Sequence, residues 1–312
     1  MCYSYDIVIQ QRNSGELMKR KFIKTVLLIS VIASSLLTCS CNKPDDGGKI
    51  AEVTVASSFA DYSYNNESST TSLNISANSQ QNSGVFDKSI GLDLDNFVRE
   101  GNFITYNGDE LTPVQGTDIS SYSGQVDFGA LKESGIDFVM VRLGGRGYGE
   151  SGALYADDFA LSNIKSAKSA GLKVGAYFFS QAISEEEAKE EADYASEILQ
   201  GEALDFPVAF DWETIEGESA RTDSVDNSTL TGFAKAFCEE IKSKGYTPMI
   251  YAKSAVFERY NLDSLENIDF WYAEYADIPS VTKGYTMWQY SESAELDGIS
   301  GGADLNLCFV EY

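Results

Sequence analysis

Asp211 and Glu213 close an apolar run, PVAFDWE, that spans residues 207–213. Residues two positions apart in a strand point to the same side, so the two carboxyl groups would share one small volume. Crowding and partial burial would raise the pKa of at least one of them, and that acid would stay protonated near neutral pH. Such a pair suits hydrolysis of a glycosidic bond. Two solvated acids at a strand end, or half of a calcium site, are the simpler alternatives.

The composition narrows the possible chemistry. The 312-residue chain has no histidine, which excludes a histidine-based triad and a zinc site with histidine ligands. Its 48 Asp and Glu against 23 Lys and Arg give a net charge of −25, which would repel a phosphate backbone. We therefore expect any acid–base chemistry to use carboxylates, Tyr, Lys or Cys, and we expect no nucleic-acid partner. No cofactor and no metal are expected either.

The part of the chain from residue 114 onward alternates between strand-like and helix-like segments. Helices are expected over 157–170, from a cap at Ser184, and over 228–244. This alternation predicts an α/β fold, a modified (β/α)8-type (TIM-like) barrel that is poor in helices in its last third. The eight strand-like segments are 114–119, 137–143, 172–180, 207–213, 247–252, 268–275, 285–290 and 303–309.

Polar and aromatic residues gather late in these strand-like segments. The active sites of such barrels lie at the carboxyl ends of the strands, so the same side chains are expected around one mouth. Aromatic rings there could pack against sugar rings, although at least half of them are expected to belong to the core. The polar residues are Asp118, Arg142, Asp211, Glu213, Gln289 and Asp304, and the aromatic ones are Tyr177, Trp212, Tyr251, Trp271, Tyr275, Trp288 and Tyr290.

Seven short motifs, in order and without large gaps over residues 115–311, resemble those of the glycoside hydrolase family 25 lysozymes. They are GTDISSYSG (116–124), GLKVGAY (171–177), FDWE (210–213), GYTPMIY (245–251), WYAEY (271–275), MWQY (287–290) and DLN (304–306). The family usually has a histidine after the residue corresponding to Tyr177, where this chain has Phe178.

The resemblance implies an N-acetylmuramidase that cleaves the β-1,4 bond from N-acetylmuramic acid to N-acetylglucosamine in peptidoglycan. Carried over by motif, Glu213 would be the general acid, and Asp211, Asp118 and Asp304 the other acids of the cleft. Retention could use a carboxylate nucleophile or the acetamido group of the substrate. The residues expected to bind the glycan are Tyr177, Arg142, Tyr251, Trp271, Tyr275, Trp288 and Gln289.

Two other functions are compatible with such a barrel: a noncatalytic cell-wall-binding protein and a chitinase-like N-acetylglucosaminidase. The glycine-rich segment 144–150 lacks the pattern of a phosphate-binding loop, and we expect it to form a flexible rim.

The first part of the chain has the features of an export signal. A basic cluster, Lys19 to Lys24, precedes an apolar run that is too short to span a bilayer, and translation could begin at Met18. Residues 1–41 are thus a leader, and Cys41 after Ser40 resembles a lipoprotein attachment site. The expected location is the outer face of the cell membrane, through a lipid anchor only, or secretion as the alternative.

The rest of the chain divides at changes in composition. Residues 42–84, rich in Ser and Asn, suit a flexible tether, 85–113 a short preceding element, and 114–312 the barrel. Cys238 and Cys308 could form a disulfide or remain two buried thiols. The sequence leaves the oligomeric state open.

Overall fold

The computed structural model describes residues 91–108 and 111–312. The predicted leader with Cys41 and the tether lie outside the described residues. No helix in the described part is both long and apolar enough to cross a bilayer.

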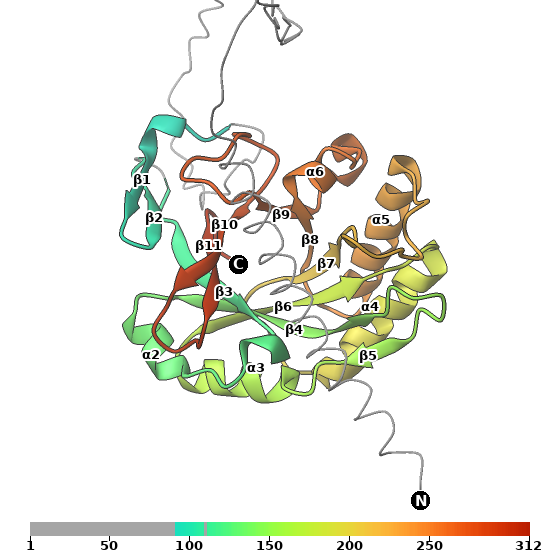
Figure 1. Cartoon of the computed structure of the whole chain (residues 1–312), viewed down its shortest axis with the longest axis horizontal. Helices are drawn as coiled ribbons and strands as arrows, with labels where there is room; N and C mark the ends of the chain where they lie inside the picture. Colours follow the sequence, from blue (N-terminus) through green and yellow to red (C-terminus); the bar gives the residue numbers. More distant parts are fainter. Residues whose placement is uncertain (1–90, 109–110) are drawn as a thin grey trace, which may run out of the picture. The chain divides into compact units, whose positions relative to one another are not determined.

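Eight strands form a closed barrel, and each corresponds to one of the segments predicted from the sequence (Figure 1). Consecutive barrel strands from β3 through β10 are parallel. β3 pairs with β4 on one side and with β11 on the other, and these two pairings close the barrel. In chain order the barrel strands are β3 (Val114–Ile119), β4 (Phe138–Arg146), β6 (Lys173–Ser180), β7 (Val208–Trp212), β8 (Pro248–Lys253), β9 (Asp269–Ala273), β10 (Met287–Glu295) and β11 (Gly302–Cys308).

The last strand departs from a regular (β/α)8 barrel. β11 runs antiparallel to both of its neighbours, β10 and β3. The start of β11 therefore lies at the same rim as the carboxyl ends of the other strands. Asp304, near the start of β11, reaches that rim because of this reversal.

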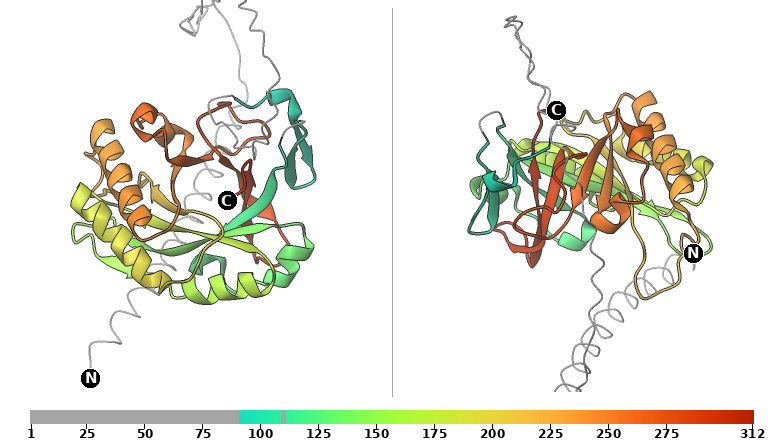
Figure 2. Two further views of the ribbon diagram at one scale, coloured as in Figure 1. Left: turned by 180° about the vertical axis from the view of Figure 1, so that it is seen from behind. Right: turned by 90° about the horizontal axis from the view of Figure 1, so that it is seen from above.

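The helices lie outside the barrel, as Figure 2 shows, and the three longest, at 160–169, 185–199 and 227–243, match the predicted positions. Ser184 caps α4, its Oγ accepting the N–H of Glu187 at 3.2 Å. Among the described residues only short helical turns follow β8, which confirms the prediction of a helix-poor last third. The helices are α2 (Phe128–Glu133), α3 (Ala160–Ser169), α4 (Glu185–Leu199), α5 (Asn227–Ser243) and α6 (Ser254–Phe257), with 3-10 turns η1 (Leu94–Asn96), η2 (Ser121–Ser123) and η3 (Leu262–Leu265).

Strand alternation divides the buried side chains into two clusters. One fills the barrel and includes Phe138, Met249 and Trp271, and the other packs between the sheet and the outer layer. Cys308 belongs to the first cluster and Cys238 to the second, and both are free thiols. The disulfide considered from the sequence therefore does not form.

The glycine-rich segment is not the flexible rim expected from its composition. β4 continues through Arg146, and residues 144–146 pair with the short strand β5 (Leu154–Ala156). A Cβ on Gly144 would lie 2.2 Å from the carbonyl oxygen of Tyr155. The glycines are therefore needed for the close approach of β5.

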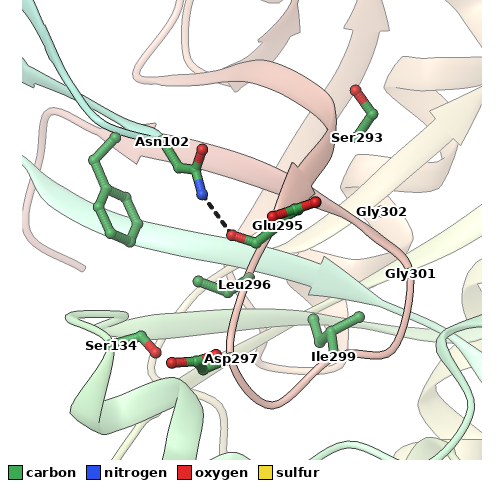
Figure 3. A pocket seen from close by; sticks show the side chains of 10 residues that line it. Asn102, Ser134, Ser293, Glu295, Leu296, Asp297, Ile299, Gly301 and Gly302 are labelled. Carbon is green, nitrogen blue, oxygen red and sulfur yellow. Dashed lines mark hydrogen bonds between the residues drawn. The ribbon is translucent and has the colours of Figure 1, made fainter.

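A two-stranded hairpin, β1 (Phe97–Glu100) and β2 (Phe103–Tyr106), packs against the end of the barrel sheet. The ring of Phe97 lies edge-on to that of Trp288, with centroids 5.3 Å apart. Asn102 donates a hydrogen bond to the carbonyl oxygen of Glu295 at 2.6 Å, above the open pocket of Figure 3. None of the four predicted catalytic acids lines that pocket.

Candidate active site

The four acids singled out from the sequence come together at one end of the barrel. Asp118 lies late in β3, Asp211 late in β7, Glu213 directly after β7, and Asp304 early in β11. Glu213 interacts electrostatically with each of the three aspartates. The closed sheet thus gathers acids that are distant along the chain.

Asp118 is buried and held by two amide side chains. Its Oδ2 accepts hydrogen bonds from Nε2 of Gln289 and Nδ2 of Asn306, both at 2.8 Å. Burial raises the pKa of Asp118, and these hydrogen bonds partly offset the increase because they favour the carboxylate. The two amides hold this side chain in place and favour its ionised form.

Asp304 forms a side-chain hydrogen bond with Asp118. Burial, followed by the negative charge of Asp118, raises the pKa of Asp304 to about 9. Asp304 is therefore the protonated partner at neutral pH and donates to the Asp118 carboxylate. This hydrogen bond joins the carboxyl groups of buried Asp118 and half-buried Asp304.

Asp211 is 5% exposed and lies on the inner side of β7. Burial and the neighbouring charge of Glu213 raise its pKa well above the ordinary value, while Lys253 acts in the opposite direction. Its Oδ1 is buried and accepts no hydrogen bond from the residues that the structure describes. An unpaired buried carboxyl oxygen is costly and is more typical of a functional site than of a core.

Glu213 is the acid that contacts a cation. Its Oε2 lies 2.6 Å from Nζ of Lys253, and the side chains are 23% and 47% exposed respectively. The backbone carbonyl of Glu213 accepts a hydrogen bond from Nε2 of Gln181 at 2.8 Å. The carboxyl group thus sits at the edge of the solvent, whereas Asp118 and Asp211 are buried beside it.

Several of the residues predicted to bind substrate instead support the acids. Oε1 of Gln289 accepts hydrogen bonds from the hydroxyls of Tyr251 at 2.9 Å and Tyr275 at 3.3 Å. The indole N–H of Trp271 donates to Oδ1 of Asn306 at 2.8 Å. Because Tyr251 and Trp271 are almost fully buried, they anchor the amides that hold Asp118. Tyr275, 41% exposed, is the one of these three aromatic residues with a ring open to solvent.

Arg142 and Tyr177 lie on the other side of the group. Arg142 donates to Oδ2 of Asp157 at 2.8 and 3.0 Å, and its guanidinium lies 4.6 Å from the ring centre of the exposed Tyr122. The pKa of Tyr177 is raised well above its usual value by burial and then by Asp118. Its ring packs edge-on against Trp271.

Trp288 is not brought together with the other predicted residues. It is 0% exposed, and its N–H donates to the carbonyl oxygen of Glu274 at 3.0 Å. In β10 it alternates with Gln289, so the two side chains point to opposite sides of the sheet. A ring buried outside the barrel offers no face to a sugar.

The sequence-based list of site residues omitted Asn306 and Lys253. Asn306 stands two positions after Asp304, so strand alternation places it on the same side and could have indicated it. Lys253 stands two positions after Tyr251 in the same way. Asp157, the partner of Arg142, lies between β5 and α3, where no repeating pattern marks it.

The fold and the site define a class of proteins, the α/β barrels with a carboxylate cluster at the mouth. The chain belongs to the glycosyl hydrolases family 25, whose family model matches residues 117–299.

Two relatives are lysozymes by name. The chain is 32% identical to the autolytic lysozyme of Clostridium acetobutylicum over 195 residues, which cover 62% of this chain and 55% of that protein. It is 24% identical to lysozyme M1 of Streptomyces globisporus over 208 residues, covering 63% and 68% respectively. The chain thus spans about half of the first relative and about two thirds of the second.

A solved structure has a fold similar to that of this chain. The spore cortex lytic enzyme SleM of Clostridium perfringens is similar with a TM-score of 0.54 and 25% identity, covering 63% of this chain and 67% of that one.

Proposed function

We propose that this protein is a peptidoglycan hydrolase of the lysozyme type, a 1,4-β-N-acetylmuramidase. The observation that carries the proposal is the convergence of Asp118, Asp211, Glu213 and Asp304 at one mouth of the barrel. Membership of family 25 and the similarity to two proteins named lysozymes support it.

In this proposal Glu213 is the general acid. A glycosidic oxygen leaves only if it is protonated as the bond breaks, and Glu213 is the acid of the cluster at the solvent edge beside two buried aspartates. In the same proposal, the pair of Asp118 and Asp304 supplies negative charge that stabilises the oxocarbenium-like centre that develops on the sugar.

Asp211 has a different role in the proposed reaction. Its buried Oδ1 could accept the N–H of the acetamido group at position 2 of the sugar, which would orient that group for attack on the anomeric carbon. This supports the route through the substrate's own acetamide over a carboxylate nucleophile. The products retain their configuration by either route.

We also propose export of the protein. The basic cluster and apolar run in residues 19–38 support a signal, and Ser40 followed by Cys41 supports lipid attachment to the outer face of the membrane. The mass of the mature amino-terminal peptide would distinguish a lipidated Cys41 from a freely secreted chain.

The test of the activity is digestion of purified cell walls, followed by mass spectrometry of the products. N-acetylmuramic acid at the new reducing ends is the expected result, and N-acetylglucosamine there would indicate the chitinase-like alternative. Glu213→Gln should lower the rate by about 10²–10⁴-fold, because Gln cannot donate the proton.

Glu216→Gln is the matched control, since Glu216 is an exposed glutamate three positions further along the same loop. It should keep the full rate, and both variants should melt like the parent protein. An unchanged rate in Glu213→Gln would reassign the acid, and wall binding without any released sugar would favour the noncatalytic alternative.

A further inference from the structure

In the part of the chain that the structure describes, the side chain of Lys253 forms no contact of the fold that needs a positive charge, apart from the one below. It is the last residue of β8 and the N-cap of α6, but its side chain makes no capping hydrogen bond. Instead Nζ contacts Oε2 of Glu213 at 2.6 Å. Among residues 91–108 and 111–312, the only ion pair of this side chain is with the proposed general acid.

Adjacent strands bring this pair together. Asp211 and Tyr251 are partners in the pairing of β7 with β8, and Glu213 and Lys253 each lie two positions further along. Lys253 thus projects from the same side of the sheet as the acids. The contact follows from strand register, with Glu213 directly after β7 and Lys253 at the end of β8.

The charges around the pair keep Lys253 protonated. Burial lowers its pKa, but Glu213, Asp211 and Glu292 raise it, and the balance is an increase. Glu213 in turn faces Asp211, Asp118 and Asp304, together with the hydroxyls of Tyr251 and Tyr275. Lys253 is the cation in contact with Glu213 within this set.

An ammonium at Oε2 conflicts with acid catalysis. A cation 2.6 Å from Oε2 favours the ionised form of a carboxyl group, whereas a general acid must carry a proton. Lys253 is 47% exposed on a flexible four-carbon stem, so it can leave Glu213 without any movement of the backbone.

We propose that Lys253 is a positioning residue that holds Glu213 as an ion-paired carboxylate in the free enzyme and moves away from Oε2 before the acid acts. This inference rests on the proposed function and adds a control of its pH range. Protonation of Glu213 competes with the ion pair, so the pair limits activity on the alkaline side.

Three variants test the proposal. Lys253→Met removes the charge but keeps most of the stem, Lys253→Arg keeps the charge, and Lys242→Met removes a charge from an exposed lysine of α5 as the matched control. The measurement is kcat and KM on soluble glycan strands from pH 4 to pH 9, with thermal melting of each variant.

The alkaline limb of the Lys253→Met profile should move upward by about half a pH unit, the size expected for a partly exposed ion pair. On that limb kcat should rise about threefold, and Lys253→Arg and Lys242→Met should follow the parent profile. An unchanged limb would overturn the proposal. So would an equal loss of kcat at every pH that Arg restores, because Lys253 would then bind substrate instead.

If the parent protein cleaves no glycan, the proposed function fails, but the ion pair can still be tested. The carboxyl carbon of Glu213, assigned with Glu213→Gln, can be titrated by NMR in the parent and in Lys253→Met. A titration midpoint at higher pH in Lys253→Met supports the ion pair, and coincident curves refute it.

Discussion

Each amide that holds Asp118 is itself fixed at its other end. Asn306 donates to Asp118 and accepts from Trp271, and Gln289 donates to Asp118 and accepts from Tyr251. A side-chain amide with both ends engaged cannot rotate without the loss of two hydrogen bonds. The acid is therefore positioned by residues that have no need to contact substrate.

Replacement of Asn306 by Leu should destabilise the protein by about 2–4 kcal/mol, because it leaves a buried indole N–H and removes a donor from a buried carboxylate. Urea unfolding followed by tryptophan fluorescence would measure this. The exposed Asn267→Leu is the control and should cost less than about 0.5 kcal/mol. A cost below about 1 kcal/mol for Asn306→Leu would contradict the account of a fully engaged amide.

At the scale of elements, β4 is paired on both sides near its end. Gly145 is opposite Tyr155 of β5 and also opposite Phe179 of β6. A Cβ at Gly145 would lie 2.8 Å from the carbonyl oxygen of Phe179 and 2.5 Å from the hydroxyl of Tyr155. The tyrosine side chain can move, but the backbone of β6 cannot do so without a change in the barrel.

Gly145→Ala should therefore lower the unfolding free energy by about 1–3 kcal/mol through overpacking. It should also increase hydrogen exchange at the amides of β5, since that strand must move away. Gly149→Ala, where an added Cβ meets no atom within 4 Å, is the comparison and should leave both measurements close to those of the parent. Equal exchange in the two variants would show that the close packing at Gly145 is not required.

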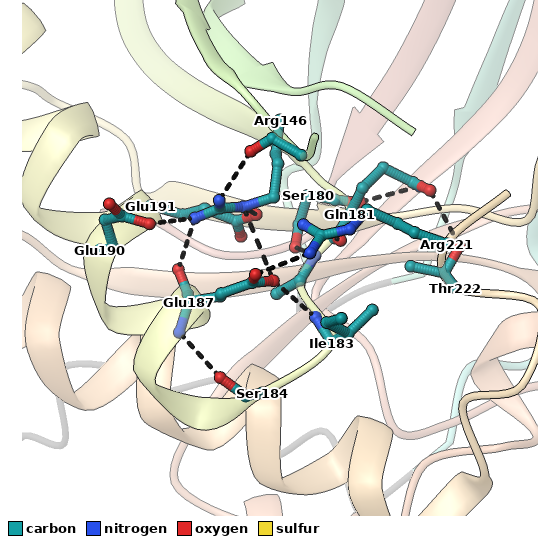
Figure 4. A network of polar contacts seen from close by, with 12 residues as sticks. Arg146, Ser180, Gln181, Ile183, Ser184, Glu187, Glu190, Glu191, Arg221 and Thr222 are labelled. Carbon is teal, nitrogen blue, oxygen red and sulfur yellow. Dashed lines mark hydrogen bonds and ion pairs between the residues drawn. The ribbon is translucent and has the colours of Figure 1, made fainter. Parts of the chain in front are cut away.

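At the scale of the whole molecule, a buried ionic network joins the barrel to α4 and to the loop after β7 (Figure 4). Arg146 of β4 donates to Glu191 at 2.8 Å and to Glu190 at 2.7 Å. Arg221 donates to Glu187 at 2.7 Å. Gln181, which holds the backbone of Glu213, accepts from Thr222 at 2.9 Å. The network thus reaches the residue proposed as the acid.

This network should make stability depend on pH. Burial raises the pKa of Glu191 from 4.5 to about 7, so the protonated form is favoured in the folded state. The stabilisation of the folded state by protonated Glu191 is complete below pH 4.5 and is lost as pH rises through 7. Glu191→Gln removes this loss, and its stability relative to the parent should therefore improve by up to about 3 kcal/mol from pH 4.5 to pH 8.

Guanidinium unfolding at several pH values would measure the difference. Glu190→Gln, at a side chain that is 60% exposed and bound to the same arginine, is the matched control. Its difference from the parent should vary little with pH. Parallel stability curves for the parent and Glu191→Gln would remove Glu191 as the source of the dependence.

The sequence by itself determined the eight strands, the main helices and the shared side of Asp211 and Glu213. Apolar runs bounded by glycine and the alternation of strand side chains are local properties, so they can be read without a fold. The order of the seven motifs also sufficed to indicate family 25, which the family match bears out.

Only the tertiary structure decided the reversal of β11, the burial of Trp288 outside the barrel and the partner of each carboxyl group. Asn306 and Asp118 are 188 positions apart, and no local pattern relates them. Their contact, the proton on Asp304 and the ion pair of Glu213 with Lys253 exist because the sheet closes. Closure of the sheet decides which side chains become neighbours and how well they are shielded from water. Neighbouring charges and burial in turn determine their pKa values.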